Sequence, residues 1–135
     1  MSSNAVLNKT TQTQLGIDTG EITAFVHREL DLLDQRRFED WAALFAEDGF
    51  YWAPVGQEQA SPLDHVSLFY DDVRTIQIRI ARLRHPRIHV QTPPSRTVHM
   101  VSNFRDFASD GKDGLTFRCN FCMFEFRSTK GQQIY

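Results

Sequence analysis

The sequence predicts an α+β domain in which helices come first and an antiparallel sheet follows. Apolar residues recur with helical spacing over residues 21–49 and again over 73–84. Long strand-like runs then occupy residues 96–135, and six of the 11 Phe residues lie within residues 104–126. Helices and strands that are segregated along the chain favour α+β over alternating α/β architecture.

Composition is that of one globular domain. The chain has 135 residues, 41% of them hydrophobic, and a net charge of −2, so it can bury a core and is not a disordered polymer. We expect a flexible arm over residues 1–18 and a single domain over 19–135. No apolar run spans a membrane and no secretory signal opens the chain, so the expected location is the cytoplasm.

Two helices are expected before residue 50. Five apolar positions share one helical face of the first, which Asp18 or Thr19 caps and which ends near Gln35: Ile22, Phe25, Val26, Leu30 and Leu33. A second helix follows at once, with Phe38, Trp41, Ala42 and Phe45 on one face, before the Asp48-Gly49 turn.

The middle of the chain reads as two short strands and a helix. Residues 50–55 and 65–70 are apolar enough for strands, and a loop joins them. Asp71-Asp72 is expected to cap a helix that runs to about Arg84, and Pro86 prevents its continuation.

The last third predicts an antiparallel sheet. Residues 96–107 and 115–127 form two strands separated by a turn, and residues 132–135 begin a third. A four-residue final strand would leave an unpaired edge. We therefore expect the domain to lack its last C-terminal strands.

Charge is distributed unevenly along the chain. Residues 1–73 carry a net charge of −9, whereas residues 74–105 hold seven Arg, no Lys and no acidic residue. Arginine suits bidentate pairing with carboxylates and protein interfaces. Two interpretations remain open: ion pairs within the domain, or a surface for a partner. Nucleic acid is not the expected partner, because no recognition motif accompanies the arginines.

Few residues suggest metal or nucleophile chemistry. His85 and His89 have the spacing of a zinc pair, but Pro86 breaks the helix between them. Cys119 and Cys122 form a C-x-x-C on a strand, which would point the two thiols to opposite faces. His27, with acidic residues four and seven positions later, is more often a polar helix flank than a ligand. We expect no catalytic, cofactor-binding or metal-binding residue from spacing alone.

Four segments in order resemble one protein family. They are LLDQRRFEDWAALFAEDGFYWAP at 32–54, FYDD at 69–72 before RIARLRHPR at 79–87, PPSRTVHMVSNF at 93–104, and CNFCMFEFRSTKGQQIY at 119–135. Together they resemble the small (beta) subunits of aromatic-ring-hydroxylating dioxygenases, whose oxygenases contain Rieske and non-haem iron centres. The resemblance covers roughly residues 21–135.

This resemblance implies a fold, partners and cofactors. The fold would be the cone-shaped, nuclear-transport-factor-like or SnoaL-like fold, a curved antiparallel sheet packed on three N-terminal helices. The chain would be a non-catalytic subunit that forms a trimer within a hexamer of three large (alpha) and three small subunits. The Rieske iron–sulfur cluster and the mononuclear iron would belong to the large subunit, which binds the aromatic substrate. Neither the substrate nor the electron-transfer partner follows from this chain.

The arginine run then gains a candidate role. We expect the contacts that join subunits to include some of Arg74, Arg79, Arg82, Arg96 and Arg105. For Arg96, the competing interpretation is a buried bridge to an acid of its own domain.

A different function class remains open. Stand-alone isomerases, dehydratases and hydrolases share the cone fold, and there Tyr51, Asp72 and His99 would be the acid–base candidates in a pocket. A hydrophobic pocket that holds a His–carboxylate pair would favour such an enzyme. A cavity filled by Phe and Trp would favour the assembly subunit.

Overall fold

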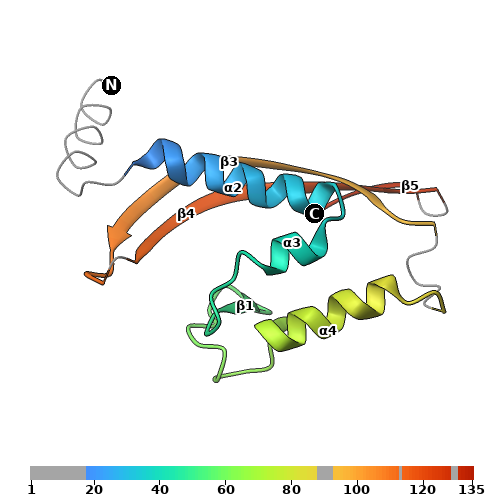
Figure 1. Cartoon of the computed structure of the whole chain (residues 1–135). Helices are drawn as coiled ribbons and strands as arrows, with labels where there is room; N and C mark the ends of the chain where they lie inside the picture. The colour runs from blue at the N-terminus through green and yellow to red at the C-terminus, as the bar shows by residue number, and fades with distance from the viewer. Residues whose placement is uncertain (1–17, 88–92, 113, 129–130) are drawn as a thin grey trace.

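A computed structural model describes residues 18–87, 93–112, 114–128 and 131–135. The order of elements is helices and short strands first, then the long strands (Figure 1): α2 Thr19–Asp34, α3 Phe38–Ala42, β1 Phe50–Ala53, β2 Phe69–Asp72, α4 Val73–Arg84, β3 Arg96–Ser109, β4 Leu115–Arg127 and β5 Gly131–Ile134. The α+β prediction is therefore confirmed. Of the expected arm over 1–18, residues 1–17 lie outside the described residues, as does His89.

The ends of α2 follow from local chemistry. Asp18 is the N-cap, and its carboxylate accepts hydrogen bonds from the backbone of Gly20 and Glu21. After the helix, Arg36 adopts a positive φ of 58°, and the Arg37 N–H bonds back to the Leu32 carbonyl. This left-handed residue turns the chain sharply into α3.

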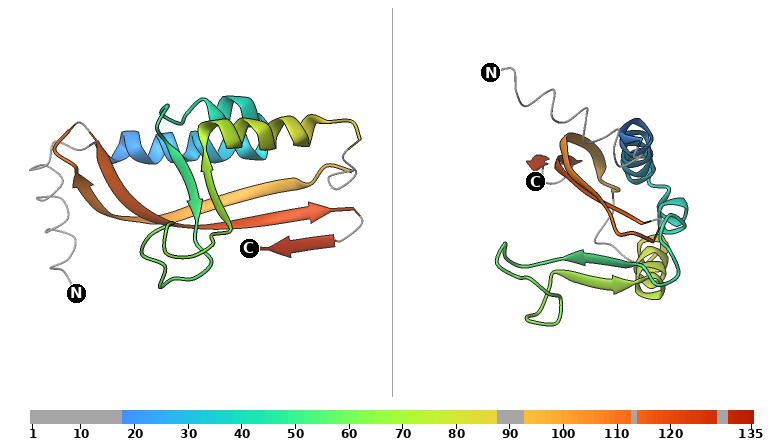
Figure 2. Two further views of the ribbon diagram at one scale, coloured as in Figure 1. Left: turned by 90° about the horizontal axis from the view of Figure 1, so that it is seen from below. Right: turned by 90° about the vertical axis from the view of Figure 1, so that its left-hand side faces the viewer.

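The strands form two antiparallel sheets. β1 pairs with β2, and β3, β4 and β5 form a three-stranded sheet in that order. The β3–β4 register shifts between Ser102 and Arg105 and again between Arg105 and Ala108, where Asn103 and Asp106 adopt positive φ. Two bulges so close together bend the strand and account for the curvature of the sheet in Figure 2.

Helix α2 packs along the long sheet, and α3 and α4 follow it on the same side of the molecule (Figure 2). Figure 2 shows α2, α3 and α4 on the same side of the molecule, with α2 lying along β3. The buried core lies where the helices meet and consists of Leu32, Trp41, Ala42, Ile76 and Ile80. Phe45 and Tyr51 pack edge-to-face on the Trp41 ring, so the hairpin joins the same aromatic cluster. None of the described helices is long and apolar enough to cross a membrane.

Three boundary predictions were wrong. The second strand of the hairpin is Phe69–Asp72, not residues 65–70, because Val66 and Leu68 are exposed loop residues. The second helix ends at Ala42, and residues 43–48 continue as turns. Asp71 does not cap α4: it is a buried strand residue, and Asp72 alone is the N-cap.

Candidate functional site

Arg79 of α4 forms an ion pair within its own domain. Its Nε lies 2.5 Å from Asp71 Oδ2, and its Nη2 donates a 3.1 Å hydrogen bond to Asp71 Oδ1. The guanidinium also lies over the Phe69 ring, 5.1 Å from the centroid. Asp71 is only 4% exposed, so Arg79 compensates a buried carboxylate. This geometry fits the intradomain interpretation of the arginine run.

Arg84, at the end of the same helix, is also paired internally. It donates two hydrogen bonds to the Glu39 carboxylate, at 2.9 and 3.1 Å, and one of 2.7 Å to the Arg36 carbonyl. The side-chain hydrogen bonds from Arg84 hold the pKa of Glu39 below its ordinary value. These contacts fasten the end of α4 to the start of α3.

Arg74 and Arg82 differ from these two arginines. Both are exposed, and neither has an ion pair within the described part of the chain. They lie at i and i+8 on α4, with the 47% exposed Ile78 at i+4, and therefore share one helix face. We call these three residues the α4 stripe.

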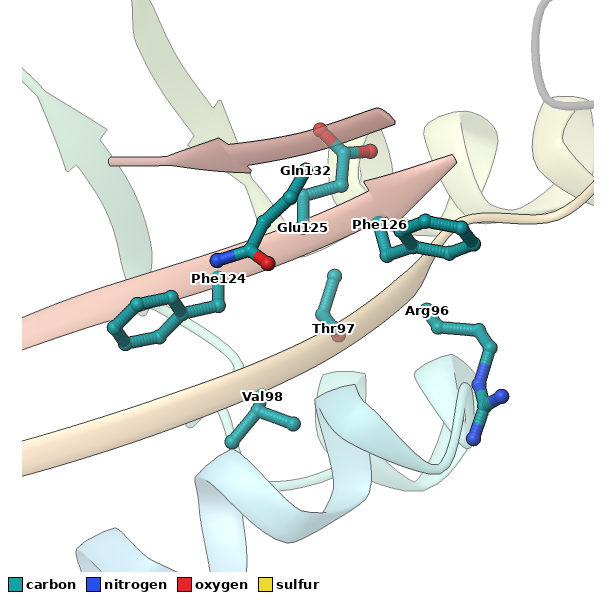
Figure 3. A pocket seen from close by; sticks show the side chains of 7 residues that line it. All are labelled: Arg96, Thr97, Val98, Phe124, Glu125, Phe126 and Gln132. Carbon is teal, nitrogen blue, oxygen red and sulfur yellow. The ribbon is translucent and has the colours of Figure 1, made fainter. Parts of the chain in front are cut away.

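Arg96 is one of the residues that line a hollow on the long sheet. The hollow has a volume of about 380 Å³ and is lined by Arg96, Thr97, Val98, Phe124, Glu125, Phe126 and Gln132. Figure 3 shows the guanidinium pointing away from the two Phe rings, so the arginine flanks an apolar surface. The main-chain register places Arg96 opposite Phe126.

Arg105 lies within the double bulge of β3. Its Nη1 donates to the Asn103 carbonyl at 2.9 Å and to Asn120 Oδ1 at 2.6 Å. Arg118 is its cross-strand neighbour, and the Nε atoms of both arginines lie within 4.0 Å of Asp106 Oδ2. Asp106 therefore offsets the repulsion between two like charges on opposite strands.

His99 has a carboxylate partner from α2. Its Nδ1 lies 2.6 Å from Asp34 Oδ1, and its backbone N–H donates to Asp34 Oδ2 at 2.9 Å. The Thr97 hydroxyl donates a third hydrogen bond, of 2.8 Å, to Asp34. The Asp34 carboxylate therefore joins the end of α2 to β3 through three contacts. The His99 side chain is only 10% exposed, so these contacts are largely shielded from water.

The other two acid–base candidates lie elsewhere. Tyr51 faces Trp41, and burial, followed by the charges of Glu29 and Asp71, raises the pKa of its phenol. Asp72 is on the opposite face of the hairpin, where hydrogen bonds from Thr75 lower the pKa of its carboxyl. The structure therefore does not bring Tyr51, Asp72 and His99 together.

Tyr51 and His99 line two different hollows. His99 lines one of about 270 Å³, and Tyr51 lines another of about 190 Å³ together with Asp71 and Arg79. The two share three walls, contributed by Leu33, Phe38 and Leu83. Trp41 and Phe69 complete the second hollow, so aromatic rings occupy much of the interior beside the hairpin.

The remaining histidines and cysteines do not form a metal site among the described residues. Among the described residues, no group of three or more His, Cys, Asp or Glu side chains could hold a metal ion. His85 is the C-cap of α4, and its Nδ1 accepts a hydrogen bond from the Arg87 N–H. Cys119 and Cys122 are free thiols, and burial raises the pKa of Cys119. A Rieske cluster or a mononuclear iron does not fit these donors.

Sequence reasoning missed Asp34 and Asp71 as partners. Asp34 is the acidic residue seven positions after His27, and helical spacing relates it only to that histidine, yet its partner His99 lies 65 residues away along the chain. Asp71 looked like a helix cap beside Asp72. The one available signal was the deficit of acids near the arginines, which implies that distant carboxylates must supply their partners.

The comparisons with known proteins agree with one another. A family model described as the ring hydroxylating beta subunit matches residues 28–135. The small oxygenase component of the p-cumate 2,3-dioxygenase system of Pseudomonas putida is 34% identical over 99 residues, which cover 72% of this chain and 55% of that protein. The small subunit of 2-halobenzoate 1,2-dioxygenase from Burkholderia cepacia is 33% identical over 88 residues, or 62% of this chain and 53% of that one.

A solved structure gives the same answer for the fold. The beta subunit of benzoate 1,2-dioxygenase from Burkholderia mallei superposes with a TM-score of 0.72 at 28% identity, over 88% of this chain and 74% of the other. The chain spans only about half the length of the two curated relatives described above. The predicted cone-like fold is therefore confirmed over the part of the chain that superposes.

Proposed function

The chain belongs to the family of ring-hydroxylating beta subunits, and from this premise we propose that it is the small subunit of a multicomponent aromatic-ring-hydroxylating dioxygenase. The observation that carries the proposal is the family match, which extends from residue 28 within α2 to residue 135 and so includes α3, α4 and the long sheet. The named relatives are small components of dioxygenase systems that act on p-cumate, halobenzoate and benzoate. The complete enzyme, of which this chain would be one subunit, would be an oxygenase that cis-dihydroxylates an aromatic compound.

In this proposal the chain supports assembly and carries out no chemistry itself. The partner is a large subunit, which holds the Rieske cluster and the mononuclear iron. The small subunits form a trimer within a three-plus-three hexamer in the cytoplasm. Arg74, Arg82, Arg96 and Arg105 remain interface candidates, because none of them is bound to a buried acid as Arg79 is. The aromatic packing around Trp41 supports a structural role for the interior.

Co-expression tests the proposal. A tagged version of this chain, co-expressed with a large (alpha) subunit of an aromatic-ring-hydroxylating dioxygenase from the same source, is expected to capture that subunit together with iron and acid-labile sulfide. The same chain produced alone is expected to bind neither iron nor sulfide. Capture that fails while both proteins are folded, as judged by circular dichroism, would contradict the proposal.

A second candidate function rests on one observation. His99 and Asp34 form a His–carboxylate pair that borders a 270 Å³ hollow with apolar walls, as an acid–base isomerase, dehydratase or hydrolase would require. Enzymatic turnover by the isolated chain, lost in His99→Gln but not in Tyr51→Phe, would support this function. If the isolated chain turns over none of a panel of cyclic ketones, diols and esters, the candidate is rejected.

A further inference from the structure

Two exposed surfaces of the molecule carry opposite charge, and each also exposes apolar side chains beside its charged residues. The first is the α4 stripe of Arg74, Ile78 and Arg82, on a helix that contains no acidic residue. The second is the loop between β1 and β2, residues 54–68, whose acids are Glu58 and Asp64. Leu63 and Val66 of this loop are 84% and 87% exposed, which makes them the most exposed large apolar residues described.

The arginines of the stripe differ from the other arginines of α4 in making no close ion pair, although the charge of Arg74 contributes to lowering the pKa of Asp72 at the start of the helix. Arg79 and Arg84 are held by Asp71 and Glu39. Arg74 and Arg82 have no ion pair within the described residues, and Ile78 between them is 47% exposed. Eight residues of helix rise separate the two guanidinium-bearing positions by about 12 Å, with the apolar side chain midway. This is an amphipathic surface suited to an acidic, apolar segment of chain.

The loop has the complementary properties. Glu58 and Asp64 are exposed and have no ion pair within the described ranges. Apolar groups flank both acids, since Val55 and Leu68 are 65% and 64% exposed in addition to Leu63 and Val66. Gln59 holds the loop in shape: its side-chain amide donates to the carbonyls of Ser61 and His65. A loop that is internally braced loses little conformational entropy when it binds.

The loop cannot reach the stripe of its own chain. β2 leads directly into α4, and Figure 2 shows the loop at the far end of the hairpin, which projects away from the helices. A contact between these two surfaces must therefore join different molecules. Because the surfaces are different, the contact is heterologous, and repetition of such a contact closes a ring when the rotation permits it.

We propose that the loop over residues 54–68 of one copy docks on the α4 stripe of the next copy. Glu58 and Asp64 then face Arg74 and Arg82, and the exposed apolar side chains of the loop cover Ile78. This inference rests on the proposed function only for the size of the ring, a trimer. The pairing itself follows from the charge, exposure and position of the two surfaces.

A charge-swap series tests the proposal by sedimentation velocity of the purified chain. Wild type is expected to sediment as a trimer at low salt and to dissociate as salt screens the charges. Both Arg74→Glu/Arg82→Glu and Glu58→Arg/Asp64→Arg are expected to be monomers. The chain that carries all four substitutions restores every opposite-charge contact and is expected to regain the trimer.

Controls separate docking from folding. Arg28→Glu reverses an exposed arginine on α2 and is expected to leave the trimer intact. Arg74→Gln/Arg82→Gln removes the charge without repulsion, and it is expected to raise the dissociation constant at least tenfold with an unchanged circular dichroism spectrum. A monomeric wild-type chain overturns the proposal, and so does a fourfold variant that folds without regaining the trimer. Capture of the large subunit by such a chain would leave the proposed function standing.

Discussion

Charged side chains are paired in the interior of the molecule but exposed to solvent on the outer face of α4. In the interior, Asp71 is 4% exposed and is held by Arg79, and Asp34 accepts three hydrogen bonds from β3. On the outer face, Arg74 and Arg82 are solvated and have no ion pair within the described residues. The same residue type, on one helix, therefore pairs with a buried carboxylate at one position and remains exposed to solvent at two others.

The comparison is sharpest for two isoleucines of α4. Ile76 is 3% exposed in the core, whereas Ile78 is 47% exposed on the stripe. We expect Ile76→Ala to lower the free energy of unfolding by about 3 kcal/mol, because it removes buried methylenes and leaves a cavity. Ile78→Ala is expected to cost under ~1 kcal/mol. Urea denaturation of the two variants measures both values, and equal losses would break the comparison.

A smaller effect than that of Ile76→Ala is expected at the α2–β3 junction. Asp34→Ala removes one carboxylate and leaves the donors of His99 and Thr97 without their partner. The expected loss is about 2 kcal/mol of unfolding free energy, within the range for hydrogen bonds to charged groups. Asp31→Ala, an exposed neighbour on the same helix, is the matched control and should change stability little. A neutral Asp34→Ala would show that the junction does not depend on these contacts.

The smallest effect is a pH dependence at the surface. Hydrogen bonds from Arg84 hold the pKa of Glu39 below its ordinary value, so this pair stabilises the fold above about pH 4.3, the pKa of an unfolded Glu. The contribution is lost as pH falls through the lower, folded-state pKa. The stability difference between wild type and Glu39→Gln should therefore shrink between pH 5 and pH 3, and salt should reduce it throughout. A difference that grows on acidification would reverse the assigned sign.

The sequence predicted the elements better than the contacts between them. Periodicity gave β4 its observed bounds, Leu115–Arg127, and placed the end of α4 at Arg84. It failed at residues 65–68, because alternating apolar residues look the same in an exposed loop and in a strand. The double bulge at Asn103 and Asp106 was also invisible, since neither position is a glycine.

The sequence predicted which residues belong to the candidate site but not which residues they contact. Charge counts identified an arginine-rich segment that lacks acids, but they could not divide its members between the fold and a partner. That division depends on the β1–β2 register, which places Asp71 on the face of the hairpin that meets α4. His99 was likewise a candidate, while its partner Asp34 lies 65 residues away and becomes visible only in three dimensions.

The most direct test compares Arg79→Ala with Arg74→Ala by urea unfolding under identical conditions. Removal of Arg79 leaves the Asp71 carboxylate buried without its cation, and the expected loss is about 3 kcal/mol, at the low end for a buried pair because Arg79 is half exposed. Removal of Arg74 should change the free energy of unfolding by less than ~0.5 kcal/mol. Similar losses for both variants would contradict the division of the α4 arginines between fold and partner.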